Sequence, residues 1–341
     1  MSAVANTSQD KIYNLRFDIN YYGADYTVDY LVHLMKKDEF IFPDFQRNYV
    51  WNSKEASKFI ESLLLGVPIP SLFFAKDKVS DKLIVIDGQQ RLRTLRYFYD
   101  GKFPNGKPFK LQHVADYFLG KTFNDLPRED QRNLSHTIIH CVIIAENEGS
   151  DRMFYLFERL NTTGNALKSQ EIRNAIYRGK FNNLLRELAA SDAWKNLYHE
   201  EDKRLEGQEL ILRFLAFHFH MNDYSGNLSD FLNDFMNRNR DLEYIDDEQI
   251  RTIFFKTLDI INKSSDKQVF YQKGRLNRSL FDTIMLFISL NISNPQPSKV
   301  QQFISKLKTS KEFKQLNKNA TASKKNIHQK LHLAEALFTA A

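Results

Sequence analysis

The arrangement of apolar residues changes near residue 150, and this change constrains the fold more than any other feature of the chain. Up to residue 145, short apolar runs suited to buried strands alternate with segments of helical periodicity. After residue 150, apolar residues recur at three- and four-residue steps, with capping residues or helix breakers between the segments. We therefore expect an α+β domain with a small mixed sheet and helices, followed by an all-α helical domain.

In the first part of the chain, β-branched and aromatic runs bounded by polar turns predict buried strands. A polar turn separates the first two runs, so these two strands should form a hairpin. The three expected strands are 69–75, 82–86 and 137–145.

Helices are expected on both sides of residue 150. The clearest begins at Asn52, which has the spacing of a capping box with Glu55, and ends before Gly66. Thr27 should cap an earlier helix over 27–37. The later helices are expected at 151–160, 169–179, 208–221, 228–239, 247–263 and 279–290.

Composition sets broad limits on the class of protein. The chain has 341 residues, 42% of them hydrophobic, with 28 Phe and 15 Tyr, which is typical of a globular protein with one or two domains. No apolar stretch is long enough to span a membrane and no signal peptide is visible, so we expect a cytoplasmic protein with no membrane contact. The single cysteine, Cys141, lies in an apolar run, which excludes a disulfide within the chain and a cysteine metal cluster.

Positive charge is concentrated near the end of the chain. The whole sequence has a net charge of +6, which supports nucleic-acid binding only weakly, but residues 299–330 contain nine lysines and one acid. Such a run is most often a solvated face, and a DNA contact is the alternative. The lysines assigned to that contact are Lys306, Lys308, Lys311, Lys314, Lys324 and Lys325.

The segment "VIDGQQRLRTLRYF" (85–98) places polar residues where a buried strand turns into a helix. Asp87 and Gln90 have capping-box spacing, and Gly88 would relieve a tight turn. These local roles leave Arg91, Arg93 and Arg96 unexplained, because a cation in the first helical turn opposes the helix dipole unless an anion lies there. The residues alone leave two readings open at this turn: a capped helix start with no ligand, or a site for an anion, most simply a phosphate.

Two further clusters contain polar residues that packing alone does not need. In "FQRNYVW" (45–51), Tyr49 and Trp51 could be a core edge while Gln46 and Arg47 face solvent, or the cluster could line a site. The second cluster, 159–179, is a loop followed by a helix with a buried stripe of Ile172, Ala175 and Ile176. Its loop could bind a sugar or phosphate or could be an ordinary inter-helix turn. Its polar residues are Asn161, Thr162, Thr163 and Gly164 in the loop, and Glu171, Arg173, Asn174 and Arg178 on the helix.

Four motifs together resemble a known family. "FQRNYVW", "PIPSLFF", "VIDGQQRLRTL" and "FERLNTTGNALKSQEIRNA" occur in this order, and the resemblance covers about 25–235. They are similar to the N-terminal domain of GmrSD-type modification-dependent restriction enzymes, a relative of the ParB/sulfiredoxin-like fold. The resemblance implies an N-terminal extension (1–24), a ParB/sulfiredoxin-like nucleotide-binding domain (25–150) and a helical domain (151–341).

The resemblance also implies roles for individual residues, with a nucleoside triphosphate and Mg²⁺ as cofactor. Asp87 and Glu171 would be metal ligands. The residues implied in catalysis are Asp87, Gln89, Gln90 and Arg91. Those implied in nucleotide binding are Gln46, Arg47, Tyr49, Gly88, Arg93, Asn161, Thr163, Gly164, Glu171, Arg173 and Asn174.

Members of the family often work with an HNH-type nuclease domain, and no such motif is visible here. "HQKLH", with His328 and His332, fits a surface helix better than a metal site. We therefore expect an NTP-binding, NTP-hydrolysing subunit of a bacterial DNA-restriction or phage-defence system, with DNA, a nuclease and a second copy of the chain as expected partners. A nucleotide-switched DNA-binding clamp or adaptor without turnover is the alternative, and a metal-dependent nickase ranks lowest. No Walker motif is present.

Overall fold

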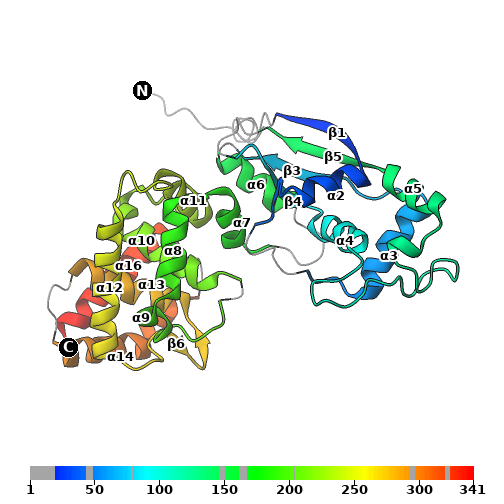
Figure 1. Ribbon diagram of the computed structural model, residues 1–341. Helices are drawn as coiled ribbons and strands as arrows, with labels where there is room; N and C mark the ends of the chain where they lie inside the picture. Colours follow the sequence, from blue (N-terminus) through cyan, green and yellow to red (C-terminus); the bar gives the residue numbers. More distant parts are fainter. Residues whose placement is uncertain are drawn as a thin grey trace. The chain divides into compact units, whose positions relative to one another are not determined.

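The computed structural model describes residues 20–43, 49–77, 80–145, 150–160, 167–202, 204–291, 296–318 and 323–341. It divides into two compact units, Met1–Leu167 and Lys168–Ala341 (Figure 1). The domain boundary expected at residue 150 precedes helix α6, whereas the division between the units follows it. Each unit is described by itself below.

The first unit contains one sheet and a set of short helices. The strands lie in the order β1-β5-β3-β4-β2, with β1/β5 and β3/β4 antiparallel and β5/β3 and β4/β2 parallel. The expected β3–β4 hairpin and mixed sheet are confirmed. The elements are β1 (Tyr21–Thr27), α2 (Val28–Lys36), β2 (Phe40–Ile41), α3 (Ser53–Leu64), β3 (Leu72–Lys76), β4 (Leu83–Asp87), α4 (Gln89–Tyr99), α5 (Arg128–His136), β5 (Ile138–Ile144) and α6 (Ser150–Leu160).

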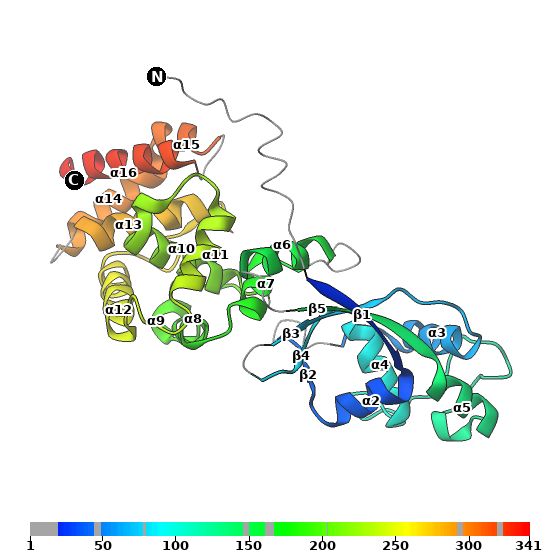
Figure 2. The ribbon, with the colours of Figure 1, turned by 90° about the horizontal axis from the view of Figure 1, so that it is seen from above.

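Both faces of the central strands are covered, which explains why β4 is apolar without alternation. Val85 belongs to the core that the strands share with α2, α3 and α4 (Figure 2). Its neighbours Ile84 and Ile86 are also buried but point to the opposite face by strand alternation. Helix α6, whose Phe157 is buried, packs near β4.

Local capping signals set the starts of two helices as expected. The Thr27 hydroxyl accepts a hydrogen bond from the backbone N–H of Tyr30 and caps α2. Asn52 and Glu55 form a complete capping box at α3, with each side chain accepting from the other residue's backbone N–H. Each cap stabilises its helix by about 1 kcal/mol.

The second unit is a helical bundle around α10, which is buried along most of its length and contacts α8, α11 and α13. All six helices expected after residue 150 are present. Its elements are α7 (Ser169–Ile176), α8 (Lys180–Ala190), α9 (Asp192–Lys195), α10 (Glu206–His220), α11 (Leu228–Arg238), α12 (Asp247–Ser264), β6 (Tyr271–Gln272), β7 (Arg275–Leu276), α13 (Arg278–Asn291), α14 (Pro297–Thr309), α15 (Lys311–Leu316) and α16 (Lys324–Thr339).

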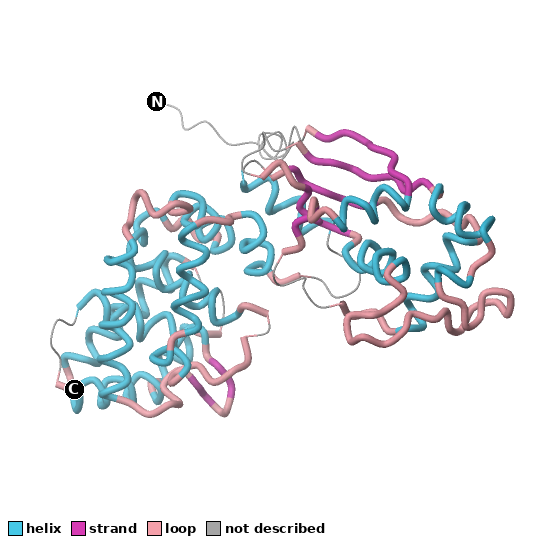
Figure 3. The backbone as a smooth tube through the Cα atoms, viewed as in Figure 1, coloured by secondary structure: helices cyan, strands magenta, loops and turns pink. Residues whose placement is uncertain are grey.

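The expectation of an all-α second part is wrong in one detail. Strands β6 and β7 form a short antiparallel hairpin (Figure 3). Its turn is Lys273–Gly274, with φ of +51° and +72°, the left-handed pair that two-residue hairpins require. Across the described ranges, none of the helices combines the length and the apolar character needed to cross a membrane.

Candidate functional site

The β4–α4 turn is built on a glycine rather than on a capping box. Gly88 is the N-cap of α4 with φ of +97°, and no side chain caps the helix. A Cβ at Gly88 would lie 2.2 Å from Cδ2 of the buried Leu72, so the turn needs glycine for space as well as for φ. The predicted box between Asp87 and Gln90 is therefore wrong, because Arg91 bonds the Asp87 side chain and the distant backbone of Val50 and Trp51 bonds that of Gln90.

Arg91 forms an ion pair with the Asp87 carboxylate. Nη2 of Arg91 donates to Oδ2 of Asp87 at 2.8 Å and to the carbonyl oxygen of Ser71 at 3.3 Å, and Nη1 donates to the carbonyl oxygen of Pro70. Burial lowers the pKa of Arg91, and the charge of Asp87 opposes that shift. The guanidinium thus ties the turn to the "PIPS" segment, and Asp87 is an anion that offsets its charge near the helix start.

Gln90 ties the same turn to the "YVW" segment. Its Oε1 accepts from the backbone N–H of Val50 at 3.0 Å and more weakly from that of Trp51 at 3.4 Å. One turn later, Thr94 shares a 2.7 Å hydrogen bond with the Tyr49 hydroxyl, whose pKa burial raises to about 12. Three motifs far apart in sequence therefore meet at the first turns of α4.

Two nitrogen atoms on α4 are buried without hydrogen-bond partners. Gln89 is only 7% exposed, and its Nε2 has no acceptor within the described part of the chain. Nε of Arg93 is likewise unpaired, although the guanidinium lies 4.6 Å from the centre of the Phe42 ring. A buried donor without an acceptor costs about 1–3 kcal/mol. An anionic ligand would supply acceptors for such donors.

At the β4–α4 turn the described residues offer a metal ion one carboxylate oxygen, from Asp87. Asp87 has one carboxylate oxygen committed to Arg91, and no described residue bonds the other. In the part of the chain that is described, no group of three or more His, Cys, Asp or Glu side chains is placed to hold a metal ion. The residues present therefore fit Mg²⁺ only as an ion shared with phosphate oxygens, which is its common arrangement in nucleotide sites.

Several predicted site residues cannot be placed. They lie in the segments 44–48 and 161–166, outside the described residues. These are Gln46, Arg47, Asn161, Thr163 and Gly164.

Helix α7 carries the remaining predicted residues, and its polar side chains are buried in the second unit. Arg173 is 2% exposed and donates from Nε to Asn233 Oδ1 at 2.8 Å and from Nη2 to Ser229 Oγ at 3.2 Å. Asn174 donates to Gln208 Oε1 at 3.0 Å. Glu171 and Asn174 are therefore buried along with the apolar stripe of α7, and both α10 and α11 contact this helix.

The Glu171 carboxylate is also held by hydrogen bonds within the second unit. Its carboxylate accepts from the backbone N–H of Lys168 at 2.6 Å and from Nη2 of Arg204 at 2.8 Å. Arg178, in contrast, is exposed. Asp87 belongs to the first unit and Glu171 to the second.

The lysines assigned to DNA from the sequence do not form one free surface. Nζ of Lys306, Lys308 and Lys324 each donate to a backbone carbonyl oxygen of the second unit, and Lys314 does so at 3.3 Å. Lys311 and Lys325 are exposed. His328 and His332 are exposed on α16, as expected for a surface helix.

The sheet order and the β4–α4 turn define a small mixed-sheet domain in which one segment, Asp87–Arg91, joins three motifs. Residues 31–178 match the sequence model of the GmrSD restriction endonuclease N-terminal domain. This match confirms the resemblance over residues 31–178, a shorter range than 25–235. No curated protein and no solved structure matches the chain. The ParB-like relation stays a prediction.

Proposed function

We propose that this chain is a nucleotide-binding subunit of a DNA-restriction or phage-defence system, and that its first unit binds a nucleoside triphosphate with Mg²⁺ at the β4–α4 turn. The family match supports the restriction context. The observation that carries the nucleotide site is Nε2 of Gln89, which is buried and has no acceptor among the described residues, at the start of a helix that has no side-chain cap. Helix N-termini favour anions, and phosphate oxygens would satisfy this amide.

Each residue of the turn has a distinct role in this proposal. Gly88 allows the backbone to approach a phosphate closely. Gln89 would donate to phosphate oxygens, and the Asp87 oxygen that no described residue bonds would hold a Mg²⁺, which would neutralise phosphate charge. Arg91 acts first as a positioning residue, because its hydrogen bonds to Asp87, Pro70 and Ser71 fix the turn.

Hydrolysis of the bound triphosphate is the first candidate activity of the site. A nucleotide-switched adaptor without hydrolysis is a second candidate, favoured by the use of Arg91 within the fold. The two candidates differ in one assay, the release of inorganic phosphate from a bound triphosphate. Release that is abolished in Asp87→Asn, with binding retained, supports hydrolysis. Binding without release supports the adaptor.

Calorimetric titration of the four ribonucleoside triphosphates with Mg²⁺ tests the site. We expect saturable binding of at least one, and a loss of about ten-fold or more in affinity in Gln89→Met, which keeps the length of the side chain and removes the donor. Gln112→Met, at an exposed glutamine of the same unit, is the matched control. Equal affinity in Gln89→Met and the intact chain, or no binding at all, contradicts the site.

A further inference from the structure

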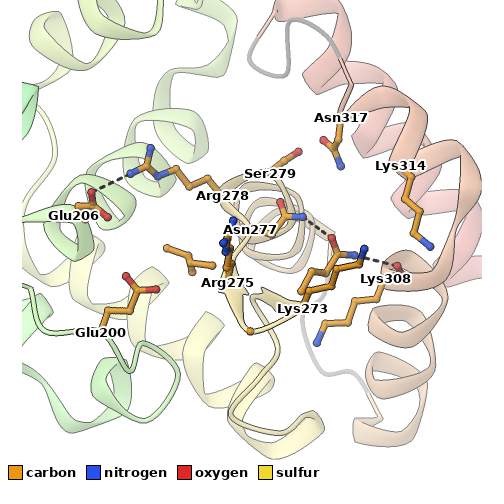
Figure 4. A pocket seen from close by; sticks show the side chains of 13 residues that line it. Glu200, Glu206, Lys273, Arg275, Asn277, Arg278, Ser279, Lys308, Lys314 and Asn317 are labelled. Carbon is orange, nitrogen blue, oxygen red and sulfur yellow. Dashed lines mark hydrogen bonds and ion pairs between the residues drawn. The ribbon is translucent and has the colours of Figure 1, made fainter.

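The hairpin β6–β7 forms one wall of an open groove in the second unit (Figure 4). The groove has a volume of about 1190 Å³ and lies beyond the residues that match the family model. Helices α13, α14 and α15 supply further parts of its lining. Only Leu276 contributes a large apolar side chain to it, so this is a polar groove rather than a hydrophobic pocket.

The lining is strongly cationic. Two glutamates, Glu200 and Glu206, also line the groove, and Glu206 pairs with Arg278 at 3.4 Å. Lys273 and Arg275 at the hairpin are exposed, and neither forms an ion pair with any described residue. The lining cations are Lys273, Arg275, Arg278, Lys308 and Lys314.

Hydrogen bonds hold the hairpin against α13 and α14, so the backbone that carries the cations is fixed in place. Asn277 donates from Nδ2 to Gln272 Oε1 at 2.7 Å, and Gln272 donates from Nε2 to the carbonyl oxygen of Lys308 at 3.1 Å. Lys308 in turn donates from Nζ to the carbonyl oxygen of Gln268 at 2.6 Å. These bonds join the hairpin, the start of α13 and the end of α14.

We propose that this groove binds the phosphate backbone of DNA. The proposal deepens the DNA engagement in the proposed function and identifies the surface that makes it. Figure 4 shows the cationic side chains spread around the groove rather than turned toward one point. A row of separated phosphates fits this spread better than one compact anion does. Apart from Leu276, no large apolar or aromatic side chain of the described residues lines the groove, so it lacks the anchor residues that a protein partner needs.

The start of α13 adds a second kind of phosphate contact. Ser279 lies in its first turn and lines the groove. Asn277 caps the backbone N–H of Leu280 at 3.0 Å. Among the described residues, no group accepts from the N–H of Arg278 or Ser279. Backbone amides at a helix start commonly contact DNA phosphates and carry no sequence information.

Fluorescence anisotropy with a labelled DNA duplex, on the full chain and in the absence of nucleotide, tests the groove. The test variant is Lys273→Glu/Arg275→Glu, which reverses two exposed charges without breaking an ion pair. The control is Lys180→Glu/Lys256→Glu, which makes the same change in net charge on exposed residues outside the groove. Far-ultraviolet circular dichroism and urea unfolding confirm that both variants are folded.

The groove predicts a loss of about ten-fold or more in affinity for the hairpin variant and a much smaller loss for the control. The slope of log affinity against log salt should fall by about 2 in magnitude, one for each lost phosphate contact. Equal losses in both variants, no binding of DNA by the intact chain at low salt, or equally tight binding of polyglutamate would overturn the proposal. Triphosphate titration of the hairpin variant separates the two sites, because the nucleotide site predicts unchanged binding there.

Discussion

Nη2 of Arg91 lies 2.8 Å from Oδ2 of Asp87, and the two residues bracket the glycine turn that starts α4. The same guanidinium bonds two carbonyl oxygens of the segment ahead of β3. With the Asp87 carboxylate, it forms a charge-assisted pair that is mostly buried on the arginine side. The pair therefore fixes the geometry of the turn, and any ligand bound there depends on it.

Loss of Arg91 should destabilise the first unit. Arg91→Ala leaves Asp87 and two carbonyl oxygens without their donor, so we expect the free energy of unfolding to fall by about 3 kcal/mol. Trp51 fluorescence during urea unfolding, in a Trp194→Phe background, reports this unit alone. In a double-mutant cycle with Asp87→Asn, we expect coupling of about 1–2 kcal/mol. Additive effects would show that the pair contributes no coupling.

The turn should also tolerate no side chain at position 88. Gly88→Ala combines a left-handed φ with a close approach to Leu72, and we expect it to cost about 3 kcal/mol. Gly101→Ala is the control, since Gly101 has φ of +72° but no atom within 4 Å of the added Cβ. It should cost about 1 kcal/mol. Equal losses of stability in Gly88→Ala and Gly101→Ala would mean that the Leu72 side chain moves aside without a free-energy cost.

Two segments of this chain have the residue spacing of a capping box, and they differ in whether the box forms. Asn52 with Glu55 and Asp87 with Gln90 have the same spacing, yet only the first pair forms a box. In the second pair, Asp87 bonds Arg91 four residues later, and Gln90 bonds residues that are distant in sequence, which include Trp51. Sequence spacing reports which local bonds can form, but it does not report competing partners brought in by the fold.

The burial of the polar side chains of α7 could not be predicted from the sequence for a related reason. Periodicity assigns apolar residues to the core and polar ones to solvent, but Arg173 and Asn174 are satisfied by polar groups on two other helices. The β6–β7 hairpin was missed because each strand has two residues, too few for alternation to be visible. Its one sequence signal was the pair Lys273–Gly274.

The buried network at α7 should matter for stability rather than for nucleotide binding. Asn174→Ala leaves Gln170 and Gln208 without a partner amide, so we expect a loss of about 2–3 kcal/mol, read from Trp194 fluorescence in a Trp51→Phe background. Arg178→Ala, at an exposed position, should change stability by less than about 0.5 kcal/mol. Unchanged stability with weakened triphosphate binding in Asn174→Ala would instead restore the role implied by the family resemblance.

Lys330 on α16 should give the second unit a distinctive pH dependence. Burial lowers its pKa from 10.5 to about 8, although nearby Asp282 opposes the shift. Between these two values the unfolded chain binds more protons than the folded one, so this group makes stability rise with pH across that window. Below about pH 8 the amine is charged in both states, and the cost of burying the charge is fully present.

Lys330→Met should therefore stabilise the protein relative to the parent most below pH 8, and this gain should shrink as the pH approaches 10.5. Urea unfolding followed by Trp194 at several pH values measures the difference. Lys325→Met, at an exposed lysine of the same helix, should show no such trend. A gain that does not vary with pH would mean that the amine of Lys330 has the same pKa in both states.

The most direct test of the central claim is a fluorescence titration of Trp51 with Mg²⁺ and triphosphate, in the Trp194→Phe background. The backbone N–H of Trp51 contacts Gln90 in the first turn of α4, so a ligand at that turn should change its emission. The account predicts a saturable change that is weakened by Gln89→Met and retained in Gln112→Met. No change at Trp51, while calorimetry detects binding or Trp194 responds in a Trp51→Phe chain, would place the nucleotide elsewhere and contradict the account.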